Sequence, residues 1–160
     1  MSWALRRYRD ADARACWDLF HRAIRIGAAD HYSQAERDAW SPAPRRLTRA
    51  RRAWLSEAVT WVACDGETLA GFMLLERDGH LDLAFVDPDH TRRGIASALL
   101  ARIEEEATTL GLTRLHTEAS RVARPFFLSR GWTLIGPETV RRNGVALERF
   151  RMTRHLKEDA

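Results

Sequence analysis

A short glycine-containing loop is the stretch of this sequence whose residue types most clearly suggest chemistry. It reads Arg92-Arg93-Gly94-Ile95-Ala96-Ser97. The first amides of a helix have no partner within the helix and carry the positive end of its dipole, so they attract anions such as phosphate. Gly94 allows the backbone to approach a ligand closely, and the arginines add positive charge. From the loop alone, an ordinary turn with two solvated arginines is an equally good interpretation.

The segments on either side predict how this loop is held. Leu81 to Val86 is an apolar run of strand length that Asp87-Pro88 ends, and the segment after the loop is amphipathic as far as Leu110. Its apolar residues recur at three- and four-residue spacing, which is typical of a helix with one buried face. The sequence therefore predicts a strand, a tight basic turn and a long helix.

The remainder of the chain predicts both helices and strands. Helices are expected after a cap at Asp10 to about residue 26, after the capping box of Ser33 and Glu36, over 45–55 and over 120–130. Further strands are expected at 3–9, 59–64, 68–76, 114–118, 132–140 and 145–153, the last two joined by Asn143-Gly144. The strand at 114–118 follows a crossover helix, so it should lie parallel to the strand at 81–86.

Length and composition are those of one soluble domain spanning residues 1–160. The chain has 160 residues, 45% of them hydrophobic and 30% charged, and no apolar run approaches the roughly 20 residues that span a bilayer. We expect a cytoplasmic protein with no membrane partner, because the N-terminus lacks a secretion signal. The net charge of +4 comes from arginines scattered among 22 acidic residues, which argues against a nucleic-acid partner.

Two motifs then identify a resemblance. The pattern Gln/Arg-x-x-Gly-x-Gly/Ala falls on Thr91 to Ala96, directly after Val86-Asp87-Pro88. The pattern Asn-x-x-Ala-x-x-Phe-Tyr followed by Gly-Phe falls on Ser120, Ala123, Phe126, Phe127, Gly131 and Trp132. With this order of elements, nearly the whole chain resembles the GNAT superfamily (GCN5-related N-acetyltransferases), and the segment from His31 to Trp40 is most similar to its YafP-like bacterial branch.

The resemblance implies an α/β (α+β) fold. The GNAT fold has a central mixed, mostly antiparallel sheet of about seven strands flanked by about four helices, with parallel fourth and fifth strands splayed apart. By position, Phe85 and Val86 would pair with the pantetheine arm of acetyl-CoA like an added strand. The amides of Arg92, Arg93, Gly94, Ile95, Ala96 and Ser97 would hold its diphosphate, and Ser120 and Phe127 would contact the arm.

Three positions depart from the family pattern. Thr91 replaces Gln or Arg, and Ser120 replaces Asn. Phe127 stands where many relatives carry a tyrosine that protonates the departing thiolate, and phenylalanine has no proton to give. Because a free thiol has a pKa of about 8.5, the thiolate is a tolerable leaving group, and we expect an active enzyme.

Asp82 is the best candidate for a catalytic base. An amine must be neutral to attack a thioester, and Asp82 lies in the fourth predicted strand, just before the expected thioester position. The alternative is that Asp82 faces solvent from an alternating strand. His116 and Glu118 share one face of the fifth predicted strand and could relay a proton or contact substrate, or form an ordinary surface pair.

His31, Tyr32 and Trp40 belong to the segment that overlies the acceptor site in the family. Tyr32 is predicted as a catalytic acid or a substrate contact, and a packing aromatic is its alternative. His31 and Trp40 are predicted to contact substrate, although tryptophans of this kind are more often core residues.

The sequence therefore predicts an acetyl-CoA-dependent N-acetyltransferase that acts by direct attack of the amine of a small molecule or an amino-terminal group. Acetyl-CoA is the expected cosubstrate, no metal is expected, and a homodimer through the last strands is implied by resemblance. No suitably placed cysteine supports a covalent enzyme intermediate. The alternative is a non-catalytic acyl-CoA-binding or regulatory module on the same scaffold.

Overall fold

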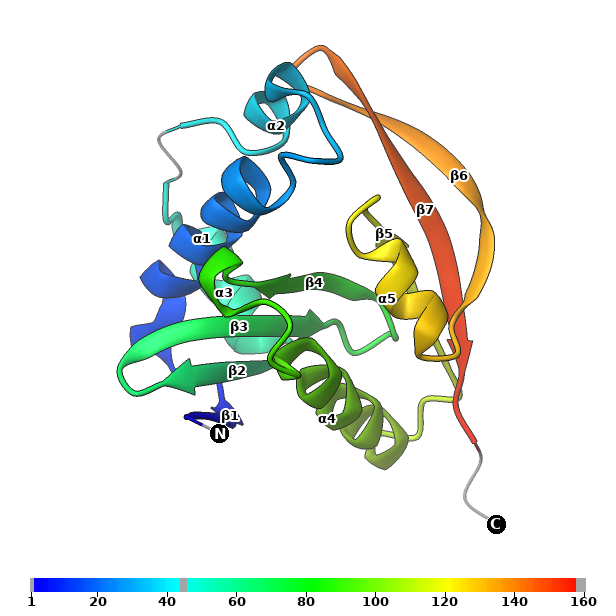
Figure 1. Ribbon diagram of the computed structural model, residues 1–160. Helices are drawn as coiled ribbons and strands as arrows, with labels where there is room; N and C mark the ends of the chain where they lie inside the picture. The colour runs from blue at the N-terminus through cyan, green and yellow to red at the C-terminus, as the bar shows by residue number, and fades with distance from the viewer. Residues whose placement is uncertain (1, 44–45, 158–160) are drawn as a thin grey trace.

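The structure is a computed structural model that describes residues 2–43 and 46–157 (Figure 1). In chain order the elements are β1 (Trp3–Arg7), η1 (Asp10–Asp12), α1 (Ala13–Arg22), η2 (Ala23–Gly27), α2 (Gln34–Trp40), α3 (Arg49–Glu57), β2 (Val59–Asp65), β3 (Thr68–Leu75), β4 (Leu81–Val86), η3 (Pro88–His90), α4 (Ile95–Thr109), β5 (Arg114–Ala119), α5 (Arg124–Ser129), β6 (Thr133–Arg142) and β7 (Val145–His155). No helix among these is long and apolar enough to cross a membrane.

The seven strands form two antiparallel sheets rather than one continuous mixed sheet. Their orders are β1-β2-β3-β4 and β5-β7-β6. The two sheets meet at a single parallel bridge between His80 and His116, where the His116 amide donates to the Gly79 carbonyl at 3.0 Å. Beyond it the Thr117 hydroxyl donates to the Leu81 carbonyl at 2.6 Å, and β4 and β5 then separate. The predicted parallel and splayed fourth and fifth strands are confirmed, and the five α-helices exceed the expected four by one.

Gly79 permits this close approach of the two sheets. Its φ of +106° lies in the left-handed region, and a Cβ atom there would stand 2.7 Å from the Arg114 carbonyl oxygen. A residue with a side chain would push β5 away from the start of β4. The glycine therefore sets the point from which the strands diverge.

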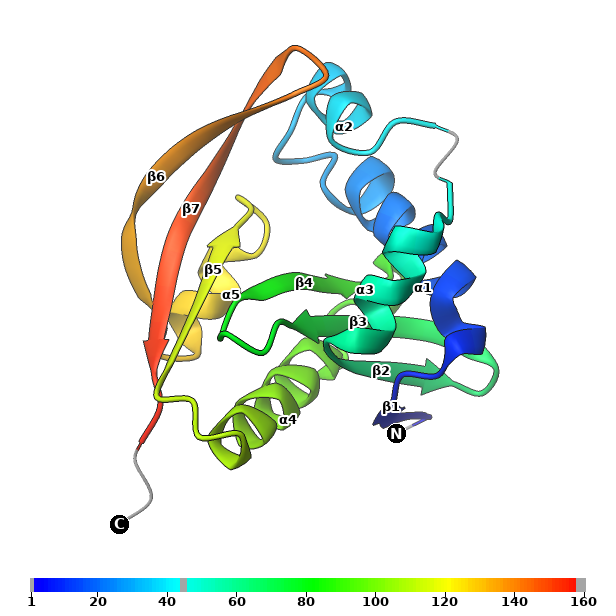
Figure 2. The ribbon, with the colours of Figure 1, turned by 180° about the vertical axis from the view of Figure 1, so that it is seen from behind.

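Each face of the first sheet packs against a different set of helices (Figures 1 and 2). The side chains of β3 alternate, because successive strand residues point to opposite faces. Met73 and Leu75 join the core under α4, whereas Phe72 and Leu74 join the core under α1. This packing holds β4 and the N-terminus of α4 in fixed relation to one another.

The long β6–β7 hairpin reaches across to α2, and both ribbon views place its turn beside that helix (Figures 1 and 2). The turn residues Asn143 and Gly144 have φ of +50° and +80°, as a tight Asn-Gly hairpin turn requires. The Asn143 side-chain amide donates to the Ala39 carbonyl at 2.8 Å. The β6–β7 turn and α2 thus cover the side of the molecule where β4 and β5 diverge, and we call this pair of elements the roof.

Several predicted boundaries are confirmed and others are wrong. The capping box is confirmed, since Ser33 Oγ accepts from the Glu36 amide at 3.1 Å and Glu36 accepts from the Ser33 amide at 2.8 Å. Asp10 is not the cap that was predicted, because Asp12 accepts from the Arg9 amide at 2.8 Å and a 3-10 turn precedes α1. The predicted helix at 45–55 is α3, and residue 45 lies outside the described residues.

Candidate active site

A cavity of about 590 Å³ lies beside the N-terminus of α4, and we call it the α4 cavity. It brings together most residues that the sequence assigned to a cofactor. Its walls include Phe85, Val86, Arg92, Gly94, Ile95, Ala96, Ser97, Ser120 and Phe127. Arg93 is not among its lining residues, and instead the Arg93 carbonyl accepts from the Trp3 indole nitrogen at 3.2 Å. Two segments about thirty residues apart in sequence therefore share one cavity.

The backbone at the start of α4 is shaped to expose amides to this cavity. Gly94 is the N-cap residue with a left-handed φ of +83°, and no side chain caps the helix. The first intrahelical bond runs from the Ala98 amide to the Gly94 carbonyl at 3.1 Å. The amides of residues 95–97 consequently have no acceptor within the helix, and together with the exposed Arg92 they favour an anionic ligand.

One edge of β4 is open. β3 pairs with the other edge, from Leu81 opposite Leu75 to Val86 opposite Gly71. Past the bridge at His80, no described strand pairs with the edge that faces β5. Backbone groups alternate between the two edges of a strand, so those of Val86 face this open edge and are free to hydrogen-bond an extended ligand in the manner of an added strand, whereas those of Phe85 face β3.

A second cavity of about 500 Å³ lies under the roof formed by α2 and the β6–β7 turn, and we call it the aromatic cavity. Trp17, Phe20, Tyr32, Trp40 and Trp54 line it, together with charged groups on β4, β5 and β7. The two cavities have six lining residues in common, namely Trp40, Ala84, Phe85, Ser120, Ala123 and Phe127. A ligand in one cavity can therefore contact a ligand in the other.

Asp82 lines the aromatic cavity and is half-buried. Burial raises the pKa of its carboxyl to about 6, with a further increase from the Glu76 carboxyl, while His80 acts in the opposite direction. The alternative in which Asp82 simply faces solvent is not what the structure shows. The carboxylate is available as a weak base near neutral pH, and it lies on the strand that the two cavities share.

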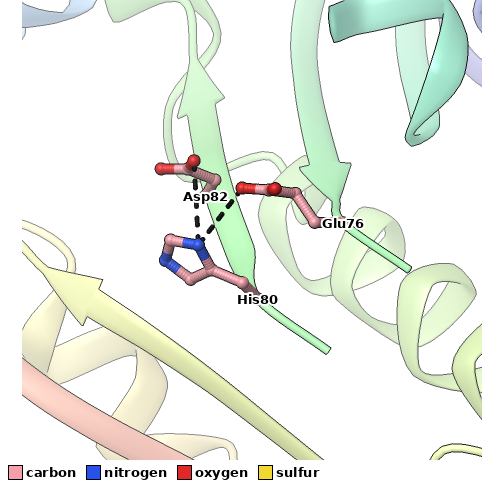
Figure 3. A group of neighbouring side chains, drawn as sticks. All are labelled: Glu76, His80 and Asp82. Carbon is pink, nitrogen blue, oxygen red and sulfur yellow. Dashed lines mark hydrogen bonds and ion pairs between the residues drawn. The ribbon is translucent and has the colours of Figure 1, made fainter. Parts of the chain in front are cut away.

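His80 connects Asp82 to a wider network that Figure 3 shows in part. Its Nδ1 lies 3.2 Å from Glu76 Oε1 and 3.7 Å from Asp82 Oδ2, and its Nε2 lies 2.5 Å from Glu118 Oε2. The ring stacks on His116 at 4.8 Å between centroids. Burial lowers the pKa of His80, but the hydrogen bond that His80 donates to Glu118 and the charges of the three nearby carboxylates raise it by more, so the net shift is upward.

Tyr32 lines the aromatic cavity, but its hydroxyl already has two backbone partners. It donates to the Glu148 carbonyl at 2.7 Å and accepts from the Arg121 amide at 2.9 Å. Burial raises its pKa above the usual value. The arrangement ties the segment before α2 to β7 and to the turn before α5, and the catalytic role of Tyr32 stays a prediction.

The three remaining predicted substrate contacts differ in placement. Trp40 lines both cavities and packs edge-on against Tyr32, with ring centroids 5.4 Å apart. His31 is exposed and lines neither cavity; its backbone amide donates to the Ala28 carbonyl at 3.0 Å, and its carbonyl accepts from Arg121 at 2.9 Å. His116 also lines neither cavity and reaches the site through the ring of His80.

Phe127 and Ser120 stand at the junction of the cavities. Phe127 is buried against Phe126 and Trp132 at centroid distances of 5.4 and 4.9 Å. Ser120 Oγ accepts from the Ala123 amide at 3.1 Å, which leaves its own hydrogen free to donate. A hydroxyl is thus present at the junction even though the aromatic residue lacks one. Neither Cys16 nor Cys64 lines either cavity.

His80 and Glu76, which carry the network, were not predicted from the sequence. A signal for His80 was present, because His80 and Asp82 are two residues apart on a strand and so share one face. Glu76 had no such signal, since it approaches them only through the turn between β3 and β4.

Comparisons with known proteins agree with this geometry. The model of the acetyltransferase (GNAT) domain matches residues 28–154. The uncharacterized N-acetyltransferase YafP of Escherichia coli (strain K12) is 30% identical over 148 residues, which cover 92% of this chain and 93% of YafP. The predicted similarity to the YafP-like branch is thereby confirmed.

Solved structures give the same picture. A GCN5-related N-acetyltransferase from Rhodopseudomonas palustris, also described as a class-II aminotransferase, superposes with a TM-score of 0.89 and 32% identity, covering 98% of this chain and 97% of that one. YncA of Salmonella typhimurium, whose structure holds its cofactor acetyl-CoA, superposes with a TM-score of 0.75 at 18% identity, covering 100% and 97%. The second likeness shows a shared fold.

Proposed function

This chain belongs to the GNAT acetyltransferase family, and from that premise we propose that it transfers the acetyl group of acetyl-CoA to an amine held in the aromatic cavity. The amine is that of a small molecule or of an amino-terminal group. The observation that carries the proposal is the position of Asp82: a half-buried carboxylate in the aromatic cavity, on the strand whose open edge borders the α4 cavity.

The α4 cavity fits acetyl-CoA in three respects. Free amides and the Arg92 guanidinium at the start of α4 suit the diphosphate, and the apolar stretch by Phe85 and Phe127 suits the arm. The open edge of β4 offers the backbone groups that an amide-containing arm needs. When bound, acetyl-CoA supplies the thioester whose acetyl group is transferred.

In the proposed reaction the amine nitrogen bonds to the thioester carbonyl carbon, the carbon–sulfur bond breaks, and CoA leaves as a thiolate. Asp82 takes the proton that the amine loses, and its raised pKa makes it a better base than a fully solvated carboxylate. His80 lies between Asp82 and Glu118, so the proton has a route from the cavity along the two splayed strands. Backbone amides of β4 near Val86 polarise the carbonyl.

Neither Phe127 nor Tyr32 is placed to protonate the departing thiolate. Phe127 cannot donate a proton, and Tyr32 already donates to the Glu148 carbonyl. Ser120 lies at the junction of the cavities with a hydrogen free, and it can donate to the cofactor arm or to the sulfur. Since a free thiol has a pKa of about 8.5, the thiolate is a tolerable leaving group that water can protonate after it departs, and the reaction does not require a side-chain acid.

The test is to incubate the purified chain with acetyl-CoA and separate amine classes: polyamines, aminoglycosides, amino acids and peptides with a free N-terminus. Free thiol and the mass of the acetylated product are measured together. At least one class should give product and thiol in equal amounts. Acetyl-CoA binding by calorimetry without product from any class would support the non-catalytic module instead. The expected homodimer, cytoplasmic location and single-domain extent stay predictions.

A further inference from the structure

We propose that Glu76, His80 and Asp82 form a binding site for Zn²⁺, and that the bound ion blocks acetyl transfer by occupying the Asp82 carboxylate. The first half of this proposal concerns binding alone. The second half rests on the proposed function. Neither was expected from the sequence, which offered no pattern of metal ligands.

The spacing of the three ligand atoms matches what a tetrahedral ion requires. Zinc sits ~2.0–2.1 Å from nitrogen and oxygen ligands, which places neighbouring ligand atoms about 3.4 Å from one another. His80 Nδ1 is 3.2 Å from Glu76 Oε1 and 3.7 Å from Asp82 Oδ2, and all three ligand atoms lie within 4.8 Å of one another. Only the two carboxylates need to adjust. Figure 3 shows the carboxylates of Glu76 and Asp82 pointing toward the same ring nitrogen of His80.

The second ring nitrogen of His80, Nε2, is already paired with a carboxylate, as it is in many metal-binding histidines. Glu118 Oε2 lies 2.5 Å from His80 Nε2, so the neutral ring keeps its hydrogen on Nε2 and presents the lone pair of Nδ1 to the other two carboxylates. A carboxylate on the outer nitrogen orients a ligating ring and increases its basicity. The stacked ring of His116, 4.8 Å away, further limits rotation of His80. The donor nitrogen is therefore positioned before any ion arrives.

The donor set and the surroundings indicate both the ion and its effect. One imidazole nitrogen with two carboxylate oxygens suits Zn²⁺ better than Ca²⁺, which takes six or more oxygen ligands. Three protein ligands leave a fourth position open for water, and Asp82 is the ligand that also lines the aromatic cavity. A carboxylate bound to zinc cannot accept a proton from an amine. Binding and catalysis therefore compete for the same oxygen.

The chain contains a matched control in His90. This histidine also lies between two carboxylates, but each ring nitrogen faces only one: Nδ1 is 3.1 Å from Asp87 and Nε2 is 3.3 Å from Asp65. Asp87 is in addition bound by Arg22 at 3.0 Å. Two carboxylates on opposite nitrogens cannot chelate one ion with the ring. His90 thus has similar neighbours without the geometry.

The binding test is calorimetric titration of the full chain, freed of metal, with Zn²⁺. We expect one equivalent to bind, with affinity reduced at least tenfold in His80→Gln and in Glu76→Gln and unchanged in His90→Gln. A thermal melt of each variant without metal checks that it is folded. Equal zinc affinity of wild type and His80→Gln, or a loss confined to His90→Gln, would overturn the proposal.

The second test measures acetylated amine by mass, because zinc also binds the CoA thiol and would disturb a thiol assay. For each variant the rate with Zn²⁺ is divided by its own rate without metal. Wild type and His90→Gln should be inhibited and recover with a chelator, while His80→Gln should be several-fold less sensitive. Equal inhibition of His80→Gln would refute the regulatory half. If no amine is acetylated, the proposed function fails, and the calorimetry still decides the metal site.

Discussion

The α4 cavity and the aromatic cavity are built in opposite ways, although they adjoin. Half of the residues that line the first come from one continuous stretch from β4 into α4, which offers backbone amides and an open strand edge. The second is made by side chains from α1, α2, α3, β4, β5 and the β6–β7 hairpin. Backbone groups are the same whatever the residue, whereas side chains define shape and charge. We infer that the α4 cavity carries the shared chemistry and that the aromatic cavity selects the acceptor.

The largest effect is expected from a substitution that disrupts the α4 cavity and leaves the aromatic cavity intact. Gly94→Glu places a carboxylate at the amides of α4 and a side chain at a φ of +83°, so affinity for acetyl-CoA should fall more than about 100-fold, as calorimetry would measure. Gly111→Glu is the matched control, because Gly111 follows the other end of α4 with a φ of +81° and open space around it. If both variants bind acetyl-CoA like wild type, the α4 cavity is not the cofactor site.

The next effect separates catalysis from cofactor binding. Asp82→Asn should lower kcat about 100-fold and leave acetyl-CoA affinity unchanged. In the wild type the carboxyl must be ionised to act, so the rate should rise with pH through the pKa of about 6. The variant should lose this rise. A pH profile identical in both proteins, measured from pH 5 to 9, would remove Asp82 from the role of base.

Tyr32 tests whether the wall of the aromatic cavity is structural. Tyr32→Phe leaves the part-buried Glu148 carbonyl and Arg121 amide without their partner, which should cost about 2 kcal/mol in the free energy of unfolding. The other tyrosine is the control: the Tyr8 hydroxyl oxygen is buried with no partner among the described residues, so Tyr8→Phe should cost little. Denaturant unfolding measures both. A Tyr32→Phe protein of normal stability but with kcat reduced about 100-fold would indicate the catalytic acid instead.

The smallest effect concerns the wall that both cavities share. Phe127→Tyr adds a hydroxyl beside Ser120 in a buried ring, and we expect kcat to change by no more than a few-fold, because the thiolate can leave unprotonated. Parallel assays with Ser120→Ala show whether that hydroxyl matters. A gain of ten-fold or more in Phe127→Tyr would mean that protonation of the thiolate limits the native reaction.

How far the sequence leads depends on the distance between the residues that make each feature. The strand, loop and helix from Leu81 to Thr109 were predicted because hydrophobic period, Asp-Pro and Gly94 all act within a few residues. The cap at Asp10 was predicted wrongly, because a 3-10 turn precedes α1 and its Asp12 carboxylate accepts from the Arg9 amide and pairs with Arg6 of β1 at 2.8 Å. Asp10 and Asp12 are both plausible from the local sequence, and a contact from another element, β1, distinguishes them. A local sequence pattern does not contain that contact.

The sequence by itself determined the family and the strand, loop and helix that place Gly94 at the start of α4, since these depend on short motifs and on local backbone preferences. Only the tertiary structure decided what surrounds the predicted residues. It joined His80 to Glu118, 38 positions away, and the Tyr32 hydroxyl to Glu148, 116 positions away. Such contacts arise only when the two sheets and the roof pack together. A local sequence pattern cannot predict which side chains meet when they are so far apart in the chain.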